Sequence, residues 1–304
     1  MHYRSVTLRP RQASSRLTED GRLDQEWDLI IRPETGLFEL HLADLWRYRD
    51  LILLFVHRDF VAQFKQTILG PAWFVLQPLL TALTFTVVFG NIARLDTAGM
   101  PKMLFYLSGN ILWLYVATCL MSTSDTFRSN APLFGKVYFP RLAVPVAVVL
   151  SQTVRFFLQF AVFLAFWIIY AGPLKAPVRM NRAALLLPAL VLVLAALALG
   201  GGIIISAATT KYRDLQHLVQ LTVQLAMYTT TVIYPLSAMH GGKSRYIILA
   251  NPVTPIIEAF RYGFLGTGAL SWPHLAYSTL VGFGLLVGGA VLFSRLERTF
   301  MDTV

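Results

Sequence analysis

The chain has 304 residues, of which 56% are hydrophobic and 14% are charged, and its mean hydropathy is +0.58. Soluble domains carry about 25% charged residues, so these values exclude an ordinary soluble domain and indicate a membrane protein. The formal net charge is +10. We assign this charge to the cytoplasmic side of a membrane protein, because no basic and aromatic pattern predicts a nucleic-acid site, and we expect no nucleic-acid partner.

The N-terminal region, residues 1–37, is polar and mixed in charge and predicts a loose cytoplasmic tail. No apolar run follows Met1, so we do not expect a cleaved signal peptide. Within this tail, residues 27–33 are compatible with a short strand or an extended segment.

The next segment, residues 38–69, combines apolar residues at helical spacing with charged residues at other positions. This pattern predicts an amphipathic helix. Its charges, which include Arg58, Asp59 and Lys65, are too frequent for a membrane span, so we expect the helix to lie along the membrane interface. The alternative is an ordinary helix packed on a small soluble domain.

Long apolar runs in residues 70–304 predict a permease domain with six transmembrane helices, because a span needs about 20 mostly apolar residues. The predicted spans are 72–93, 103–122, a helix within 142–170, 183–208, 218–239 and 275–294. Of the 26 Lys and Arg residues, 17 fall on the side of the N-terminus and 8 on the other side. The excess predicts a multi-pass protein with both termini in the cytoplasm.

Between the fifth and sixth spans lies an apolar stretch, 251–266, that is too short to cross a membrane. It begins with two prolines and contains two charged residues. We interpret it as one or two short helices that dip into the outer leaflet, and the alternative is a surface loop. The residues expected to shape this outer gate are Asn251, Pro252, Glu258 and Arg261.

The chain shows no motif for chemistry of its own. Gly242, Lys243 and Ser244 match the end of a phosphate-binding loop, but Ser237 stands where that motif requires its first glycine. The 6 histidines lie in separate segments without the spacing of a metal site. Arg155 is the single charge inside an apolar run, where it either reaches the inner interface or lines a polar conduit. We therefore expect a protein that is not an enzyme and binds no metal.

Many aromatic residues fall within the predicted spans. One interpretation is an interfacial belt with core packing; the other is a conduit lined by rings, along which sugar faces slide. The candidate conduit residues are Trp73, Phe85, Phe89, Phe105, Tyr106, Trp113, Tyr115, Tyr228 and Tyr234.

Three motifs occur in order along residues 38–304. They are RDFVAQFKQTILGPAW at 58–73, followed by Gln77 and Pro78; FGKVYFPR at 134–141; and NPVTPIIEAFR at 251–261. Together they resemble the membrane subunit of the type-2 ABC exporters of polysaccharides, a family that moves lipid-linked O antigens, capsules and teichoic acids.

The resemblance implies partners and cofactors. Two copies of such a permease pair with two separate ATP-binding cassette ATPase subunits, which hold ATP and Mg²⁺, so this chain would carry no cofactor. It implies that the loop 125–141 forms a coupling helix seated in the ATPase. The coupling residues expected on this basis are Phe134, Lys136, Val137, Tyr138, Phe139, Pro140 and Arg141. It also implies that 251–261 forms the outer gate helices.

The resemblance also implies a function: ATP-driven export of a lipid-linked, O-antigen-like polysaccharide across the bacterial cytoplasmic membrane. ATP binding in the partner would move the coupling helix, while the gap between two permeases admits the lipid anchor and the glycan passes between them. The alternatives are an ABC-type exporter of a small lipid or drug, and a membrane transferase or flippase that acts alone.

Overall fold

The computed structural model describes residues 4–7, 30–33, 42–65, 67–130, 139–211, 214–239 and 242–300. The chain divides into two compact units, Met1–Glu39 and Leu40–Val304. The elements are β1 (Arg4–Thr7), β2 (Ile30–Pro33), α1 (Leu42–Arg47), α2 (Arg49–Phe64), α3 (Ala72–Phe85), the π-helix η1 (Thr86–Ile92), α4 (Lys102–Ser124), α5 (Thr126–Ser129), α7 (Ala143–Ala171), the 3-10 helix η2 (Arg182–Leu186), α8 (Leu187–Lys211), α9 (Leu215–Ala226), the 3-10 helices η3 (Met227–Thr229) and η4 (Leu236–Ala238), α10 (Lys243–Ala250), α11 (Thr254–Leu265) and α12 (Trp272–Phe300).

The first unit contains a two-stranded antiparallel pair in which Val6 lies opposite Ile31. An extended segment predicted within 27–33 is therefore confirmed at β2. The rest of the predicted tail lies outside the described residues.

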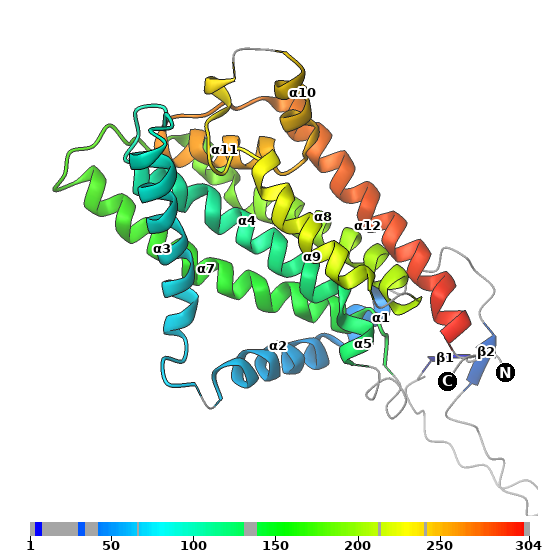
Figure 1. Ribbon diagram of the computed structural model, residues 1–304. Helices are drawn as coiled ribbons and strands as arrows, with labels where there is room; N and C mark the ends of the chain where they lie inside the picture. The colour runs from blue at the N-terminus through cyan, green and yellow to red at the C-terminus, as the bar shows by residue number, and fades with distance from the viewer. Residues whose placement is uncertain are drawn as a thin grey trace, which may run out of the picture. The chain divides into compact units, whose positions relative to one another are not determined.

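Five helices of the second unit are long and apolar enough to cross a membrane: Ala72–Ile92, Lys102–Ser124, Ala143–Ala171, Arg182–Thr209 and Trp272–Phe293. At about 1.5 Å per residue each covers about 30 Å or more, the thickness of the hydrocarbon core. These helices confirm five of the predicted spans. The helix α4 is the central one. Protein buries 72% of its apolar stretch, against 22% for the apolar stretches of α3, α7 and α12. It packs against α3, α7 and α8 (Figure 1).

The helices α8 and α12 run in the same direction and touch closely. Gly282 lies against Leu197, and Gly289 lies against Gly200, so residue numbers rise together along the contact. A Cβ atom placed on Gly200 would come within 2.3 Å of the backbone of α12. Since both helices run in one direction, the chain between them must return along the bundle.

The return is made by residues 214–239, which lie antiparallel to α4. Gln216 donates a hydrogen bond to Asp125 at one end of α4 (3.1 Å), and Val232 lies beside Gly109 near the other end. The two contacts are 16 residues apart on α4, which is about 24 Å.

The predicted continuous helix over 218–239 is nevertheless wrong. The helical part ends at Thr229 with η3, and residues 230–235 are not helical. Residues 229–233 are all β-branched, and Pro235 follows them. Such residues lower helix propensity, and a proline interrupts the helix before it. The count of six crossings stays a prediction.

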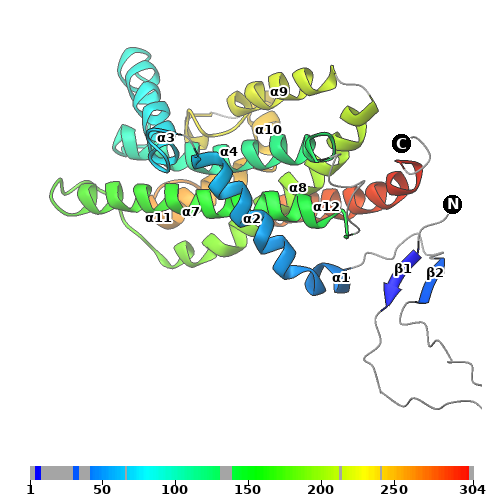
Figure 2. The ribbon, with the colours of Figure 1, turned by 90° about the horizontal axis from the view of Figure 1, so that it is seen from below.

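The predicted interface helix is formed by α1 and α2. It lies across one end of the bundle, below α7 (Figures 1 and 2). Ile52 and Phe55 are buried against α7, whereas Leu53, Leu54 and Val61 are largely exposed. The helix is thus apolar on a buried face and also on part of its exposed face. This exposed apolar surface suits the predicted place at a membrane interface, which stays a prediction.

Candidate functional site

Of the predicted coupling segment, residues 134–141, the structure describes the last three residues, which lie at the end of the bundle near α2. Phe134, Lys136, Val137 and Tyr138 lie outside the described residues. Phe139 is buried and packs edge to face on Phe55 of α2, with 5.7 Å between ring centroids. Pro140 and Arg141 are half-buried and precede α7 directly. Phe139 therefore links the loop to α2 and α7, and its part in docking stays a prediction.

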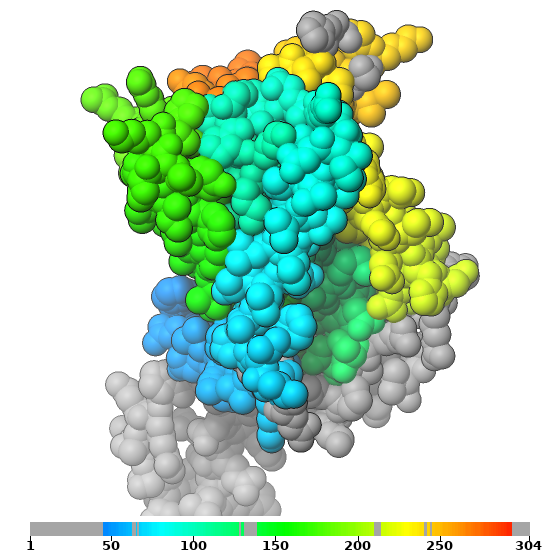
Figure 3. Space-filling view, turned by 60° about the vertical axis from the view of Figure 1, so that its left-hand side comes forward, coloured from blue at the N-terminus to red at the C-terminus, as the bar shows by residue number. Residues whose placement is uncertain are grey.

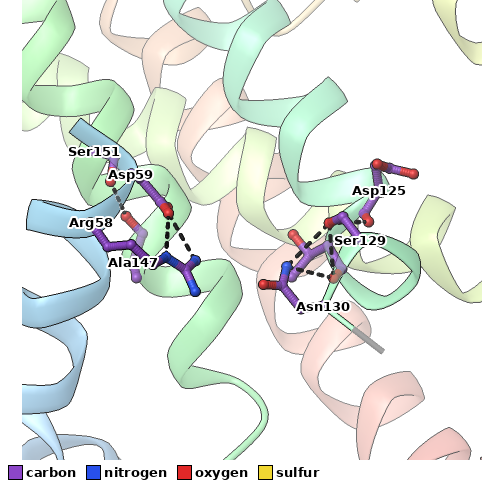
Figure 4. Close-up of polar contacts among 8 residues, drawn as sticks. Arg58, Asp59, Asp125, Ser129, Asn130, Ala147 and Ser151 are labelled. Atoms are coloured by element: carbon purple, nitrogen blue, oxygen red, sulfur yellow. Dashed lines mark hydrogen bonds and ion pairs between the residues drawn. The ribbon is translucent and has the colours of Figure 1, made fainter. Parts of the chain in front are cut away.

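Charged residues of α2 lie beside this packing. Arg58 donates hydrogen bonds from Nε and Nη2 to Asp59 Oδ1, at 3.0 and 2.8 Å (Figure 4). The Arg58 guanidinium also lies over the Phe55 ring, 4.8 Å from its centroid. Lys65 is exposed just after α2. Arg58 thus covers the exposed edge of the contact between α2 and the coupling segment.

The end of α4 meets α5 and α9 beside the same loop. Ser129 Oγ donates to the carbonyl of Asp125 (2.9 Å), and Asn130 Nδ2 donates to the carbonyl of Thr126 (3.0 Å); Figure 4 shows this turn. The Asp125 side chain accepts the hydrogen bond from Gln216. Asp125 therefore joins the start of α9 to the turn that leads into the coupling segment.

One face of α4 is only half-buried, although most of this helix is fully enclosed. Half-buried positions at helical spacing on this face include Leu114, Thr118, Met121 and Ser122, and Asp125 follows directly after the helix. Figure 3 shows the surface hollowed between α3 and α9, with the second half of α4 at the back of the hollow. We call this face, with these five residues, the α4 groove.

The α4 groove has a polar neighbour on α7. Gln152 Nε2 donates to Ser122 Oγ (3.4 Å), and Gln152 Oε1 accepts from Arg155 Nη1 (3.1 Å). The Arg155 guanidinium lies over the ring of Phe74 of α3, 5.0 Å from its centroid. Arg155 therefore extends from α7 to α3 behind the groove. A polar strip at this depth is unusual for a surface that faces lipid.

The candidate conduit aromatics separate into two groups. Phe105, Tyr106, Trp113 and Tyr115 are buried in the core of a single chain, and Tyr115 is hydrogen-bonded to Thr153 (2.8 Å). Most of each ring is covered by protein in this single chain, and the role of these four residues in a conduit stays a prediction. Half of the side-chain surface of Trp73 and Tyr228 is exposed, and Phe85, Phe89 and Tyr234 are half-buried.

The opposite end of the bundle is organised by Arg261 of α11, which is only 1% exposed. Its Nε donates to Ser108 Oγ (3.2 Å), and its Nη2 donates to the carbonyls of Val232 (3.1 Å) and Phe105 (3.3 Å). Its Nη1 donates to the carbonyl of Thr231. Two of these carbonyls belong to the non-helical part of the return segment. In a membrane such carbonyls need a donor from the protein, and Arg261 supplies it.

The surroundings of Arg261 fit the guanidinium closely. The group lies 3.7 Å over the ring of Phe105, and a Cβ atom on Gly109 would come within 2.8 Å of Nη2. Glu258 Oε1 lies 3.7 Å from Nη1. Burial lowers the pKa of the Arg261 guanidinium to about 10, and the charge of Glu258 opposes this shift, so Arg261 is protonated at neutral pH.

The other predicted gate residues frame α11. Asn251 Oδ1 accepts a hydrogen bond from the backbone N–H of Val253 (3.1 Å), and its Nδ2 donates to Thr229 Oγ1 (3.3 Å). Pro252 is half-buried in the turn. A short helix is thus present within the predicted stretch 251–266, as α11, and a second short helix, α10, precedes that stretch. Their role as a gate stays a prediction.

Sequence reasoning missed the partners of Arg261. A glycine and a serine at 108–109 inside an apolar span, together with a β-branched run before Pro235, are the signals that could have pointed to them. It also missed Gln216, because its partner Asp125 is 91 residues away along the chain and the contact leaves no local signal in the sequence.

The five apolar helices and their polar groove define a multi-pass membrane transport protein. Among the described residues, no group of His, Cys, Asp or Glu could hold a metal ion. Residues 50–265 match the ABC-2 type transporter family, and the chain belongs to this family. The predicted resemblance is confirmed, as are a membrane location and membership of a family of permeases that work with ABC ATPase subunits.

Individual relatives agree with this assignment. The chain is 26% identical over 254 residues to the O-antigen export system permease protein RfbA of Klebsiella pneumoniae, covering 83% of this chain and 94% of the relative. It is 27% identical over 264 residues to the protein of the same name from Myxococcus xanthus, covering 86% and 98%. A second Klebsiella pneumoniae protein of that name is 25% identical over 253 residues.

Proposed function

We propose that this chain is the permease subunit of an ATP-driven exporter of a lipid-linked, O-antigen-like polysaccharide. The observation that carries the proposal is the α4 groove, a partly polar hollow along a helix that is otherwise buried. The names of the relatives, which match over nearly their whole length, supply the class of cargo.

The exporter would contain two copies of this chain, with their α4 grooves facing a shared passage. Thr118, Ser122 and Asp125 would then offer hydroxyl and carboxylate groups to glycan hydroxyls, while Leu114 and Met121 contact the apolar faces of sugar rings. The Arg155 guanidinium behind the groove is already held by Gln152 and the ring of Phe74. The passage would therefore offer a neutral chain mainly hydroxyl and apolar contacts and bind it weakly enough to let it slide. The lipid anchor would stay in the surrounding membrane lipid.

Power would come from two ABC ATPase subunits that bind ATP and Mg²⁺, so this chain would hold no cofactor and catalyse no reaction. The coupling segment, 134–141, would dock in the ATPase on the cytoplasmic side, where both termini also lie. Phe139 supports this role because its ring is packed against α2 at the start of α7. A displacement of the loop would therefore move both helices.

The opposite end would be the exit on the outer face of the bacterial inner membrane. There α10 and α11 would form the outer gate, with Asn251, Pro252, Glu258 and Arg261 holding its base. Arg261 ties α11 to α4 and to the return segment. The gate would therefore respond to movement of either element.

The test is transport by the permease with its ATPase partner in proteoliposomes, measured with purified lipid-linked O antigen. The variant Ser122→Trp fills the α4 groove and should abolish export while ATPase assembly remains. The matched control is Leu192→Trp, because Leu192 is 61% exposed on the outside of α8. Export that survives Ser122→Trp would contradict a passage along α4. Transport of a small lipid or drug but not of glycan would favour that alternative, and glycan movement without any ATPase would favour a flippase that acts alone.

A further inference from the structure

A cavity of about 250 Å³ lies at the α11 end of the bundle, separate from the α4 groove. Its walls come from α4, η4, α10, α11 and the loop before α12. At about 30 Å³ per water, it has room for about eight waters. That space suits a single sugar ring.

Two polar groups on its wall have no hydrogen-bond partner among the described residues. They are Glu258 Oε1 and Thr267 Oγ1, and both atoms are inaccessible to bulk solvent. Glu258 is 2% exposed, and its neighbour Arg261 is already used by carbonyl groups. Glu258 Oε1 has its ion pair with Arg261 Nη1 at 3.7 Å, which is too long for a hydrogen bond. A buried carboxylate oxygen without a hydrogen bond is unfavourable unless a donor reaches it. The cavity is the space from which such a donor can come.

The remaining walls restrict the chemistry of the ligand. Arg261 lies at the back of the cavity and Arg245, which is exposed, lines it from α10. These cations disfavour a cationic ligand, and the Glu258 carboxylate disfavours an anion. Phe105, Pro235 and Leu236 add an apolar wall. Apolar walls with a few fixed polar groups are typical of small-molecule sites, and this combination fits a neutral ring with several hydroxyl groups.

We propose that this cavity binds one neutral sugar unit, whose hydroxyl group donates to Glu258 Oε1 and contacts Thr267 Oγ1. Arg245 would donate to a second hydroxyl near the mouth. The choice of a sugar rests on the proposed export function, and the site would hold a glycan unit behind α11 as the chain leaves. Glu258 also pairs with Arg261. A sugar bound to Glu258 would therefore alter the contacts of Arg261, the residue that holds the return segment.

The experiment measures ligand binding by saturation-transfer NMR on the full-length permease in complex with its ATPase, without nucleotide. The probes are methyl α-D-mannoside and methyl β-D-galactoside as neutral sugars, glucuronate as an anion, choline as a cation and glycerol as a small reference. We expect transfer to at least one neutral sugar, well above that to the other three probes. Equal transfer to all probes would overturn the proposal, as would a preference for choline or glucuronate.

Variants locate the signal. Glu258→Gln should weaken sugar binding about tenfold, since the sugar hydroxyl then donates to a neutral amide oxygen and no longer to a charged carboxylate. Ser237→Trp, at the exposed part of the lining, should block binding altogether and leaves the Arg261 contacts intact, so it serves if Glu258→Gln fails to fold. The matched control is Tyr246→Trp, an exposed position of α10 outside the lining, which should bind like the unmodified chain.

Binding that is unchanged in Ser237→Trp would overturn the site. Binding needs neither ATP nor transport, so the two proposals fail separately. A complex that exports no glycan contradicts the proposed function even if sugar binds, whereas export without any sugar binding contradicts only this cavity.

Discussion

Replacement of Arg261 by methionine is the sharpest test of how the return segment is held. The Arg261→Met variant keeps the apolar length of the side chain but removes the donors to Thr231 and Val232. Each buried carbonyl left without a donor costs about 1–3 kcal/mol. Glu258 also becomes a buried charge without its partner, which costs about 3–5 kcal/mol. The sum is at least about 5 kcal/mol, a large part of the stability of a typical domain.

The assay is thermal unfolding of the purified permease in detergent, followed by size-exclusion chromatography. At about 2 °C per kcal/mol for a chain of this size, the midpoint should fall by about 10 °C or more. The double variant Arg261→Met with Glu258→Gln removes the unpaired charge and should recover about 3 kcal/mol. Arg245→Met, which removes an exposed arginine of the neighbouring helix, is the control. A midpoint within about 2 °C of the unmodified chain in Arg261→Met would refute this account of the return segment.

Three further predictions concern packing and coupling. Gly200→Ala should lower the unfolding midpoint, because its Cβ would meet the backbone of α12 at 2.3 Å, whereas Gly284→Ala on the open face of α12, with nothing within 4 Å, should leave it unchanged or slightly raised; equal effects would contradict the close contact. Phe139→Ala should destabilise the chain by about 3 kcal/mol through loss of a buried ring, measured by the same unfolding assay, and a neutral result would show that the ring is not anchored. Replacing Tyr138 and Arg141 together by alanine should weaken co-purification with the ATPase and lower its turnover, and intact assembly with normal turnover would disprove the coupling assignment.

The sequence was sufficient for the membrane class and for five of the spans, because a long apolar run leaves few other structures available in lipid. It was insufficient for the return segment. Residues 218–239 contain no charged residue and many apolar ones. Hydropathy does not distinguish a helix from non-helical backbone whose hydrogen bonds are made by a neighbouring side chain. The β-branched run at 229–233 carried the local signal. Its meaning depended on Arg261, which is 29 residues further along the chain from Val232.

The aromatic residues show the same limit in another form. Phe105, Tyr106 and Tyr115 lie on the same helix as the residues of the α4 groove, and their side chains are equally compatible with a conduit by composition. Their burial is decided by which neighbours cover each face of α4. Helical spacing separates the faces of a helix, but it does not identify the face that stays open. The polar positions Thr118 and Ser122 at the back of the hollow were therefore overlooked in favour of rings.

One pair of elements, α4 and the return segment, is joined by side-chain hydrogen bonds at both ends of the bundle. At the α2 end, Asp125 holds Gln216; at the α11 end, Arg261 holds Thr231 and Val232. Between these contacts α4 and the return segment run side by side over about 24 Å. The continuous helix α4 would transmit movement along its axis. The non-helical residues 230–235 of the return segment would bend instead, because side chains and not a helix make their hydrogen bonds. Movement of the coupling segment would then reach α11 through α4, and Arg261 would determine whether the return segment follows it.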